Sequence, residues 1–202
     1  MTNEQYAVGI DLGGTNLKLA LLAGDNRVIF RETVPTEAAD GHEAVLRRMI
    51  DGVRRMASHV PAGTVTSIGL GVPGVLDMAT GVVIDLHNFP GRWNGVPAGA
   101  FLQRETGLVT HLINDARAFV FAESRLGAAK GADTALCFTI GTGVGGGIVT
   151  HGQVLFGLGG AAGEVGHIII EADGPRCPCG NRGRGDAPGR PGFHDRNRPS
   201  RE

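Results

Sequence analysis

Two glycine-containing turns carry the first chemistry that this sequence could perform. Asp11-Leu12-Gly13-Gly14-Thr15-Asn16 follows a short apolar run, and residues 140–147 form a second glycine-rich turn between apolar runs. Glycine allows positive φ and lets backbone N–H groups approach phosphate oxygens, while Asp11 can hold Mg²⁺ through water. Neither turn matches the P-loop or Rossmann pattern. Each alone also fits an ordinary hairpin, but the pair favours binding of a polyphosphate.

Asn114-Asp115 stands where an apolar run ends and a helical pattern begins. A helix N-terminus favours a carboxylate by about 0.3–1 kcal/mol. In that position Asp115 could accept a proton from a hydroxyl group. The alternative is that Asp115 serves only as a first-turn acid or N-cap, and the local sequence by itself favours this alternative.

A third group of chemically active residues lies between residues 163 and 180. Glu164 and His167 are three positions apart, so one helical turn would face both the same way, which suits a polyol ligand. His167, Cys177 and Cys179 supply three ligands of the kind that Zn²⁺ takes, one short of a structural site. The alternatives are a solvated Glu, a structural His and a turn without metal. Cys137 lies in an apolar run and is expected to be a core residue.

The elements that must position these residues alternate between strands and helices. Apolar runs and turn residues predict strands over residues 6–11, 17–23, 27–33, 65–72, 75–77, 82–85, 108–113, 134–139 and 146–150. Helical spacing predicts helices over residues 41–59, 97–106 and 115–126. The chain should therefore form two α/β lobes with a cleft between them, the first over residues 1–115 and the second beginning at residue 116.

Composition excludes several classes of function. The 202 residues are 42% hydrophobic and carry a net charge of −1, so neither nucleic acid nor an anionic membrane is an expected partner. No membrane-spanning run and no signal peptide are present, and three cysteines make no disulfide framework. A cytoplasmic location is the default expectation.

Taken in order, these segments resemble the ROK family of sugar kinases and related repressors, most of all the bacterial glucokinases. The resemblance covers about residues 6–183. Each of the six segments that carry it is a weak family signature alone, but their occurrence in this order is highly specific. The segments are Asp11–Asn16, Gly71-Val72-Pro73-Gly74, Asn114-Asp115-Ala116, Gly141–Gly147, Gly163-Glu164-Val165-Gly166-His167 and Cys177-Pro178-Cys179-Gly180.

The resemblance implies an actin-like ATPase fold, with two ribonuclease-H-like lobes around a cleft. It implies transfer of the γ-phosphoryl group of ATP, with Mg²⁺, to a hexose hydroxyl; glucose is the expected sugar, and other hexoses stay open. Asp115 matches the catalytic base. The residues that match or lie near sugar contacts are Gly74, Asn88, Asn114, Glu164 and His167. The phosphate-loop matches are Asp11, Gly13, Gly14, Thr15, Asn16, Lys18, Thr142 and Gly143. The zinc-ligand matches are His167, Cys177 and Cys179.

The sequence departs from the family pattern after Gly183. The family continues with a fourth Cys and a sugar-binding Glu, where this chain has Arg184 and Asp186. Family chains are also about half as long again, so the second lobe is expected to be incomplete. Residues 184–202 are rich in Arg, Pro and Gly and are expected to form a disordered tail. We interpret the change as a frameshift near residue 183, which translation of the neighbouring reading frame would test.

Three other functions fit the same segments. An incomplete second lobe would lower kinase activity and promote aggregation, so the chain could be an inactive product. The second alternative is a sugar-binding regulator without a DNA-binding domain. The repressors of the family carry an N-terminal helix-turn-helix, and against this reading the first expected strand begins near Tyr6, which leaves no room for one. An actin-like ATPase without sugar specificity is the third, and Glu164 and His167 argue against it. A homo-oligomer is typical of the family but is not expected of an incomplete lobe.

Overall fold

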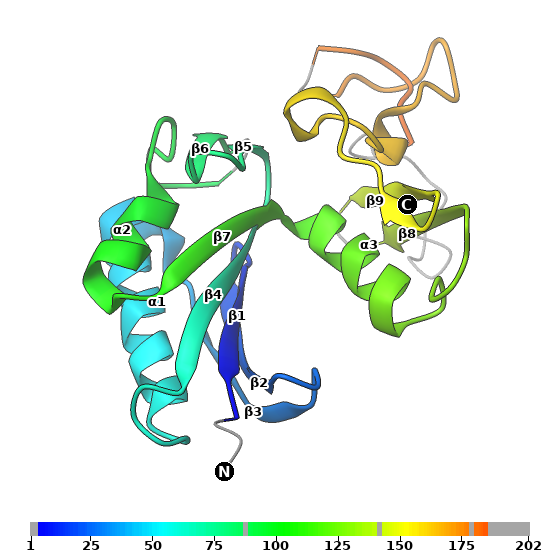
Figure 1. Ribbon diagram of the computed structural model, residues 1–202. Coiled ribbons are helices and arrows are strands. Elements are labelled where there is room, and N and C mark those ends of the chain that lie inside the picture. The colour runs from blue at the N-terminus through cyan, green and yellow to red at the C-terminus, as the bar shows by residue number, and fades with distance from the viewer. Residues whose placement is uncertain (1–3, 87–88, 141–142, 178–179, 186–202) are drawn as a thin grey trace, which may run out of the picture. The chain divides into compact units, whose positions relative to one another are not determined.

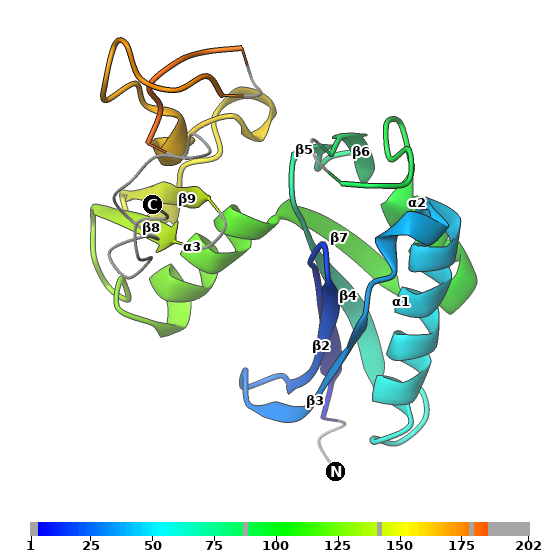
Figure 2. The same ribbon diagram turned by 180° about the vertical axis from the view of Figure 1, so that it is seen from behind.

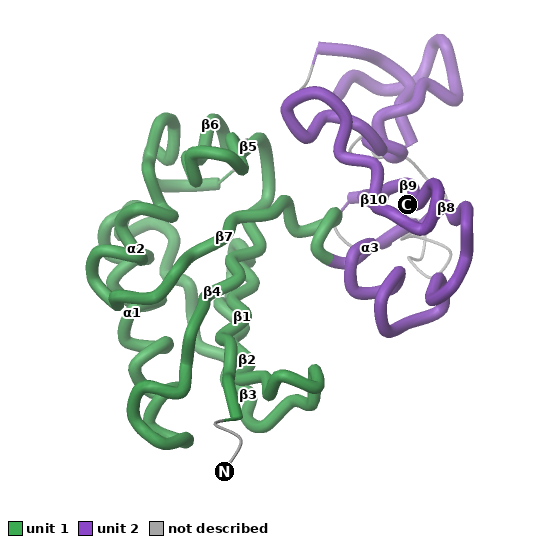
Figure 3. The backbone as a smooth tube through the Cα atoms, viewed as in Figure 1, with its two compact units in different colours: residues 1–118 green, residues 119–202 purple. Residues whose placement is uncertain are grey.

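The computed structural model describes residues 4–86, 89–140, 143–177 and 180–185. The chain divides into two compact units, residues 1–118 and residues 119–202 (Figure 3). The division falls inside helix α3, Asp115–Leu126. No helix among the described residues combines the length and the apolar character needed to cross a membrane.

A five-stranded sheet forms the centre of the first unit (Figure 1). Its strands lie in the order β3-β2-β1-β4-β7, where β1 to β3 are antiparallel and β1, β4 and β7 run parallel. The strands expected over residues 6–11, 17–23 and 27–33 form the antiparallel part of this sheet. The strand bounds are β1 Tyr6–Leu12, β2 Asn16–Ala23, β3 Val28–Pro35, β4 Val65–Val72 and β7 Val109–Asn114.

Helices α1 (His42–Ala57) and α2 (Ala98–Thr106) cover one face of this sheet (Figure 2). Alternate residues of β1 and β2 are buried beneath α1, as period-two patterning requires. The helix in turn buries Val45, Leu46, Met49, Ile50, Val53 and Met56. Gly52 allows α1 to lie close to β2, because a Cβ there would be 2.5 Å from the Leu19 side chain. The short η1 helix, Ala38–Asp40, connects β3 to α1.

A small two-stranded hairpin, β5 (Val75–Asp77) and β6 (Val82–Asp85), follows β4. Asp77 closes its turn by accepting the backbone N–H groups of Ala79 at 3.0 Å and Thr80 at 3.2 Å. Hydrogen bonds from Thr80 and Ala79 lower the pKa of Asp77. The candidate residue Asn88 follows this hairpin in the sequence and is outside the described residues.

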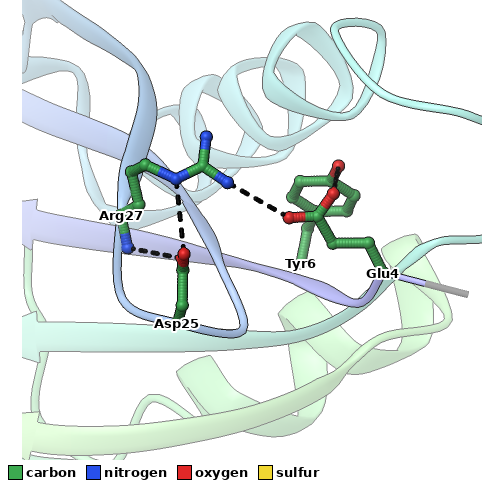
Figure 4. Close-up of polar contacts among 4 residues, drawn as sticks. All are labelled: Glu4, Tyr6, Asp25 and Arg27. Atoms are coloured by element: carbon green, nitrogen blue, oxygen red, sulfur yellow. Dashed lines mark hydrogen bonds and ion pairs between the residues drawn. The ribbon is translucent and has the colours of Figure 1, made fainter. Parts of the chain in front are cut away.

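A polar network ties the beginning of β1 to the β2–β3 turn (Figure 4). Arg27 binds Asp25 at 3.3 Å and Glu4 at 3.4 Å, and the Tyr6 hydroxyl donates to Glu4 at 2.9 Å. This bond raises the pKa of Tyr6, and the Arg27 N–H lowers the pKa of Asp25. Because the charged side chains of Glu4, Asp25 and Arg27 are at least half exposed, their ion pairs contribute little to stability.

The second unit contains a three-stranded antiparallel sheet in the order β10-β9-β8. Its elements are β8 Ala135–Ile140, β9 Val144–Thr150, β10 Gln153–Val154 and the 3₁₀ turns η2 Leu158–Gly160 and η3 Val165–His167. Leu136, Phe138 and Ile140 alternate along β8 and are each about half exposed. An edge strand with such a face is prone to associate with other strands.

Candidate functional site

The carboxyl ends of β1, β4 and β7 meet at one edge of the large sheet. Asp11 pairs with Gly71 across β1 and β4, and Val72 pairs with Asn114 across β4 and β7. Parallel strands place their carboxyl ends together, and neighbouring strands are about 4.8 Å apart. Asp11 and Asp115 are therefore separated by roughly two strand spacings, on the order of 10 Å.

The first glycine turn joins β1 to β2 at this edge. Its Gly13 N–H donates to the carbonyl of Asn16 at 3.0 Å. Neither Gly13 nor Gly14 has a positive φ, so this turn does not use the left-handed backbone that glycine allows. Gly13 is required for space instead, because a Cβ would be 2.7 Å from the Asn16 carbonyl oxygen. Gly14, Thr15, Asn16 and Lys18 are exposed.

Lys18 lies opposite Asp11 in the β1–β2 register, and their side chains form an ion pair at 3.4 Å. Both side chains are more than half exposed, at 67% and 51%. Solvent screening makes such a pair weak, so either charge is readily given up to a ligand. The pair places one carboxylate and one ammonium group beside the turn.

Asn114 uses both ends of its side-chain amide within the fold. Its Nδ2 donates to the Gly74 carbonyl at 3.1 Å, and its Oδ1 accepts the Arg117 N–H at 3.2 Å. The second bond is an N-cap of helix α3. Asp115 is therefore not the N-cap that the local sequence suggested. Its exposed carboxylate accepts the neighbouring Ala116 N–H at 2.7 Å, at the start of the helix.

Gly74 is where the chain turns away from the end of β4. Its φ is +90°, and a Cβ would lie 2.3 Å from the Asp85 carbonyl oxygen. Only glycine fits both conditions without strain. Together with its bond to Asn114, this explains how the β4 turn is fastened to the start of α3.

In the second unit the glycines after residue 144 belong to strand β9, which begins earlier than the predicted residue 146. Gly145, Gly146 and Gly147 pair with Thr139, Phe138 and Cys137 of β8. The segment 163–166 crosses directly over them. A Cβ on Gly163 would be 3.0 Å from the Gly147 Cα, and one on Gly166 would be 1.8 Å from the Val144 carbonyl oxygen. These glycines thus permit two backbone segments to pack in direct contact. Of the two predicted phosphate-loop residues in this unit, Thr142 is outside the described residues and Gly143 is exposed.

Glu164 and His167 flank one 3₁₀ turn, and the His167 N–H donates to the Glu164 carbonyl at 3.0 Å. Residues i and i+3 eclipse in such a turn, so the backbone places both side chains on one side. Both are exposed, while Val165 and Gly166 between them are buried.

Cys177 and Gly180 of the Cys-Pro-Cys-Gly segment lie beside a small antiparallel pairing. Arg176 pairs with Arg182, the Cys177 N–H donates to Asn181 at 2.9 Å, and Gly180 N–H donates to Cys177 at 3.0 Å. Cys179 is outside the described residues, and the described ones hold no group of three metal-binding side chains. The predicted fourth-ligand position, Arg184, is 1% exposed and pairs with Ile169. A guanidinium offers no lone pair, so these residues do not fit a four-ligand zinc site.

Cys137 is partly buried in β8, and burial followed by the nearby Glu123 charge raises the pKa of its thiol. A protonated thiol is a poor nucleophile. We expect iodoacetamide to alkylate Cys137 more slowly at pH 7.5 than it alkylates a free cysteine, with the rate rising as pH increases. Mass spectrometry of the Cys137 peptide would measure this, and rapid labelling at neutral pH would contradict it.

Two structural supports of the site gave no signal in the sequence. Thr36 is fully buried and its hydroxyl donates to the Gly13 carbonyl at 2.6 Å. At the start of α1, His42 Nδ1 lies 2.9 Å from the Gly91 carbonyl, beside the buried Trp93. Trp93 donates its Nε1–H to Pro90 at 3.0 Å, so the turn before it is held from two sides.

Comparison with known proteins agrees with this arrangement. The ROK family matches residues 7–186. A glucokinase of Thermotoga maritima is 40% identical over 176 residues, which is 87% of this chain and 54% of the relative. An N-acetylmannosamine kinase of Escherichia coli is 36% identical over 177 residues, or 87% of this chain and 58% of the relative.

Solved structures give the same answer. A ROK family glucokinase from Streptomyces griseus, in complex with glucose and AMPPNP, superposes with a TM-score of 0.77 at 30% identity, covering 89% of this chain and 55% of that one. A ROK family transcriptional regulator, a homologue of the E. coli MLC protein, has a TM-score of 0.78 at 30% identity, with 89% and 45% covered.

The chain therefore belongs to the ROK family and has the actin-like ATPase fold of its sugar kinases. It spans about half the length of the curated relatives that it matches. The family resemblance and the fold class predicted from the sequence are both confirmed.

Proposed function

We propose that this chain carries the phosphate-binding and catalytic half of an ATP-dependent hexose kinase, with glucose as the substrate and glucose 6-phosphate and ADP as products. One observation supports the proposal most directly. Asp115 is exposed at the sheet edge that also bears Asp11 and the Gly13–Asn16 turn, while Asn114 takes over the capping of α3.

In this proposal the side chains of the sheet edge have separate roles. Asp115 accepts the proton of the attacking sugar hydroxyl. The hydroxyl oxygen bonds to the γ-phosphorus of ATP as the bond between that phosphorus and the oxygen that leaves with ADP breaks. The Gly13–Asn16 turn, Lys18, Thr142 and Gly143 bind the phosphates. Asp11 is the carboxylate that would hold Mg²⁺, whose charge offsets that of the phosphates. No step is assigned to zinc.

The sugar contacts in this proposal are Gly74, Asn88, Asn114, Glu164 and His167, and only Asn88 is outside the described residues. Asn114 retains a second N–H for a sugar hydroxyl after its bond to Gly74. The relatives include both glucokinases and N-acetylmannosamine kinases. Glucose is proposed because the relative of higher identity among these two is named a glucokinase.

A coupled assay of ADP release against a hexose panel tests the proposal, with the mass of the protein verified first. We expect ADP release to require a hexose and to be fastest with glucose. Trp93, the chain's one tryptophan, follows the proposed sugar contact Asn88 closely in the sequence, so its fluorescence is expected to change with sugar. ATP consumption that ignores hexose would contradict the proposal.

A sugar-binding regulator is the second candidate, because a ROK transcriptional regulator shares this fold at a TM-score of 0.78. Sugar-dependent thermal stabilisation without any ADP release would favour it. Stabilisation by Mg-ATP together with hexose-dependent turnover would exclude it.

A further inference from the structure

The turn between β1 and β2 is held in place from the β3–α1 connection. Thr36, which follows β3, is 0% exposed, and its hydroxyl donates to the Gly13 carbonyl at 2.6 Å. Its backbone N–H donates to the Thr15 carbonyl at 2.9 Å. One buried residue thus binds the carbonyl groups on both sides of Gly14.

Thr36 is itself fastened to helix α1. Arg48 of that helix donates from Nη1 to the Thr36 carbonyl at 3.3 Å. The same guanidinium is ion-paired with Glu37 and Asp40 of the connection. A continuous set of polar contacts therefore runs from the Gly13 peptide to a helix packed on the sheet, which makes the position of the turn well defined.

The hydroxyl of Thr36 also determines which way the Gly13–Gly14 peptide faces. A trans peptide is planar, and its C=O and N–H point in opposite directions. Because the Gly13 carbonyl points at Thr36, the Gly14 N–H points away from Thr36. Gly14 is exposed and has no heavy atom within 4 Å of a Cβ built on it. An N–H in such a place can approach an anion closely.

We propose that Thr36 is a positioning residue for the first phosphate loop, Gly13–Asn16, and thereby sets the affinity for Mg-ATP. Thr36 acts through the loop and does not touch the nucleotide itself. If its hydroxyl is removed, the Gly13 carbonyl loses its partner and is free to turn toward the phosphates, which it repels. This inference rests on the proposed kinase function, and it adds a residue to which the family motif does not extend.

Thr36→Val removes the hydroxyl and keeps the shape, whereas Thr36→Ser keeps the hydroxyl. We expect Thr36→Val to raise the KM for Mg-ATP about tenfold, with kcat and sugar affinity within about twofold of the starting protein. Hydrogen exchange in residues 11–16 should accelerate by a similar factor. Thr36→Ser should restore both. Thr106→Val, which deletes a comparable bond to Leu102 at 2.7 Å in α2, should change neither.

Arg48→Met is a second variant in case Thr36→Val does not fold, and it should raise the same KM by a smaller factor. The inference is overturned if Thr36→Val lowers thermal stability while the KM for Mg-ATP and exchange in residues 11–16 stay unchanged. A starting protein that binds Mg-ATP without turning over hexose contradicts only the proposed function. The variants are then compared by the dissociation constant for Mg-ATP and by exchange, which still decide the role of Thr36.

Discussion

Asp115→Asn is expected to lower hexose-dependent ADP release by about 10²–10⁴-fold, because an amide cannot accept the hydroxyl proton as a carboxylate does. Hexose affinity should stay within about twofold, since the shape of the side chain is kept. The loss in stability should be small, about 0.3–1 kcal/mol, which is what a first-turn acid contributes at a helix N-terminus. Steady-state kinetics and thermal unfolding of the same sample would measure both.

The difference between these magnitudes separates a catalytic base from a merely helix-stabilising acid. Asn114 already caps α3, so the capping alternative predicts no kinetic loss beyond that of a slightly less stable protein. Asp133→Asn is the matched control, because Asp133 is an exposed aspartate of the second unit, 78% exposed in its side chain. Retained turnover in Asp115→Asn would remove Asp115 from the catalytic role.

Gly166→Ala is expected to lower the free energy of unfolding of the second unit by about 3 kcal/mol, the upper part of the usual range for overpacking. The added Cβ would lie 1.8 Å from the Val144 carbonyl oxygen and 2.8 Å from its carbon. Both are backbone atoms of β9, so no side-chain rotation can relieve the clash. The segment 163–167 must move off the strand, taking Glu164 and His167 with it.

Chemical denaturation and hydrogen exchange over residues 144–167 would measure this effect. Gly69→Ala is the control, since Gly69 has no heavy atom within 4 Å of its built Cβ and no positive φ. That change should stay within about 0.5 kcal/mol of the starting protein. Equal stability of the Gly166→Ala and Gly69→Ala variants would show that the loop does not lie on β9 as described.

Local patterns were sufficient to predict most of the fold. Alternating apolar residues with intervening turns predicted the meander of β1 to β3, and helical spacing predicted α1 within two residues at its C-terminal end, Ala57. These signals depend on one element at a time, which is why a single sequence carries them. The actin-like fold class came from the family resemblance and not from periodicity.

The supports of the site could not be predicted in the same way. Thr36 follows a proline and precedes a glutamate, so it has the appearance of an exposed loop residue. Its burial results from α1 and the first turn meeting over it, which is a tertiary contact. The cap of α3 is a second example: the sequence suggested Asp115 as a first-turn acid or N-cap, whereas in the structure Asn114 caps the helix by accepting the Arg117 N–H. Arg184 was expected in a tail and is a buried residue that pairs with Ile169.

The crossing of residues 163–166 over β9 has a consequence for mutational surveys of this family. Gly163 and Gly166 would each fail to tolerate a side chain, because a Cβ would meet the β9 backbone at 3.0 and 1.8 Å, and Gly146 would fail because its Cβ would lie 2.1 Å from the Cys137 carbonyl oxygen of β8. Such positions would score as strongly as true ligand contacts in a scan of cell growth. Their intolerance would reflect the close approach of two backbone segments, so only a separate measurement of ligand affinity could distinguish them from the proposed sugar contacts.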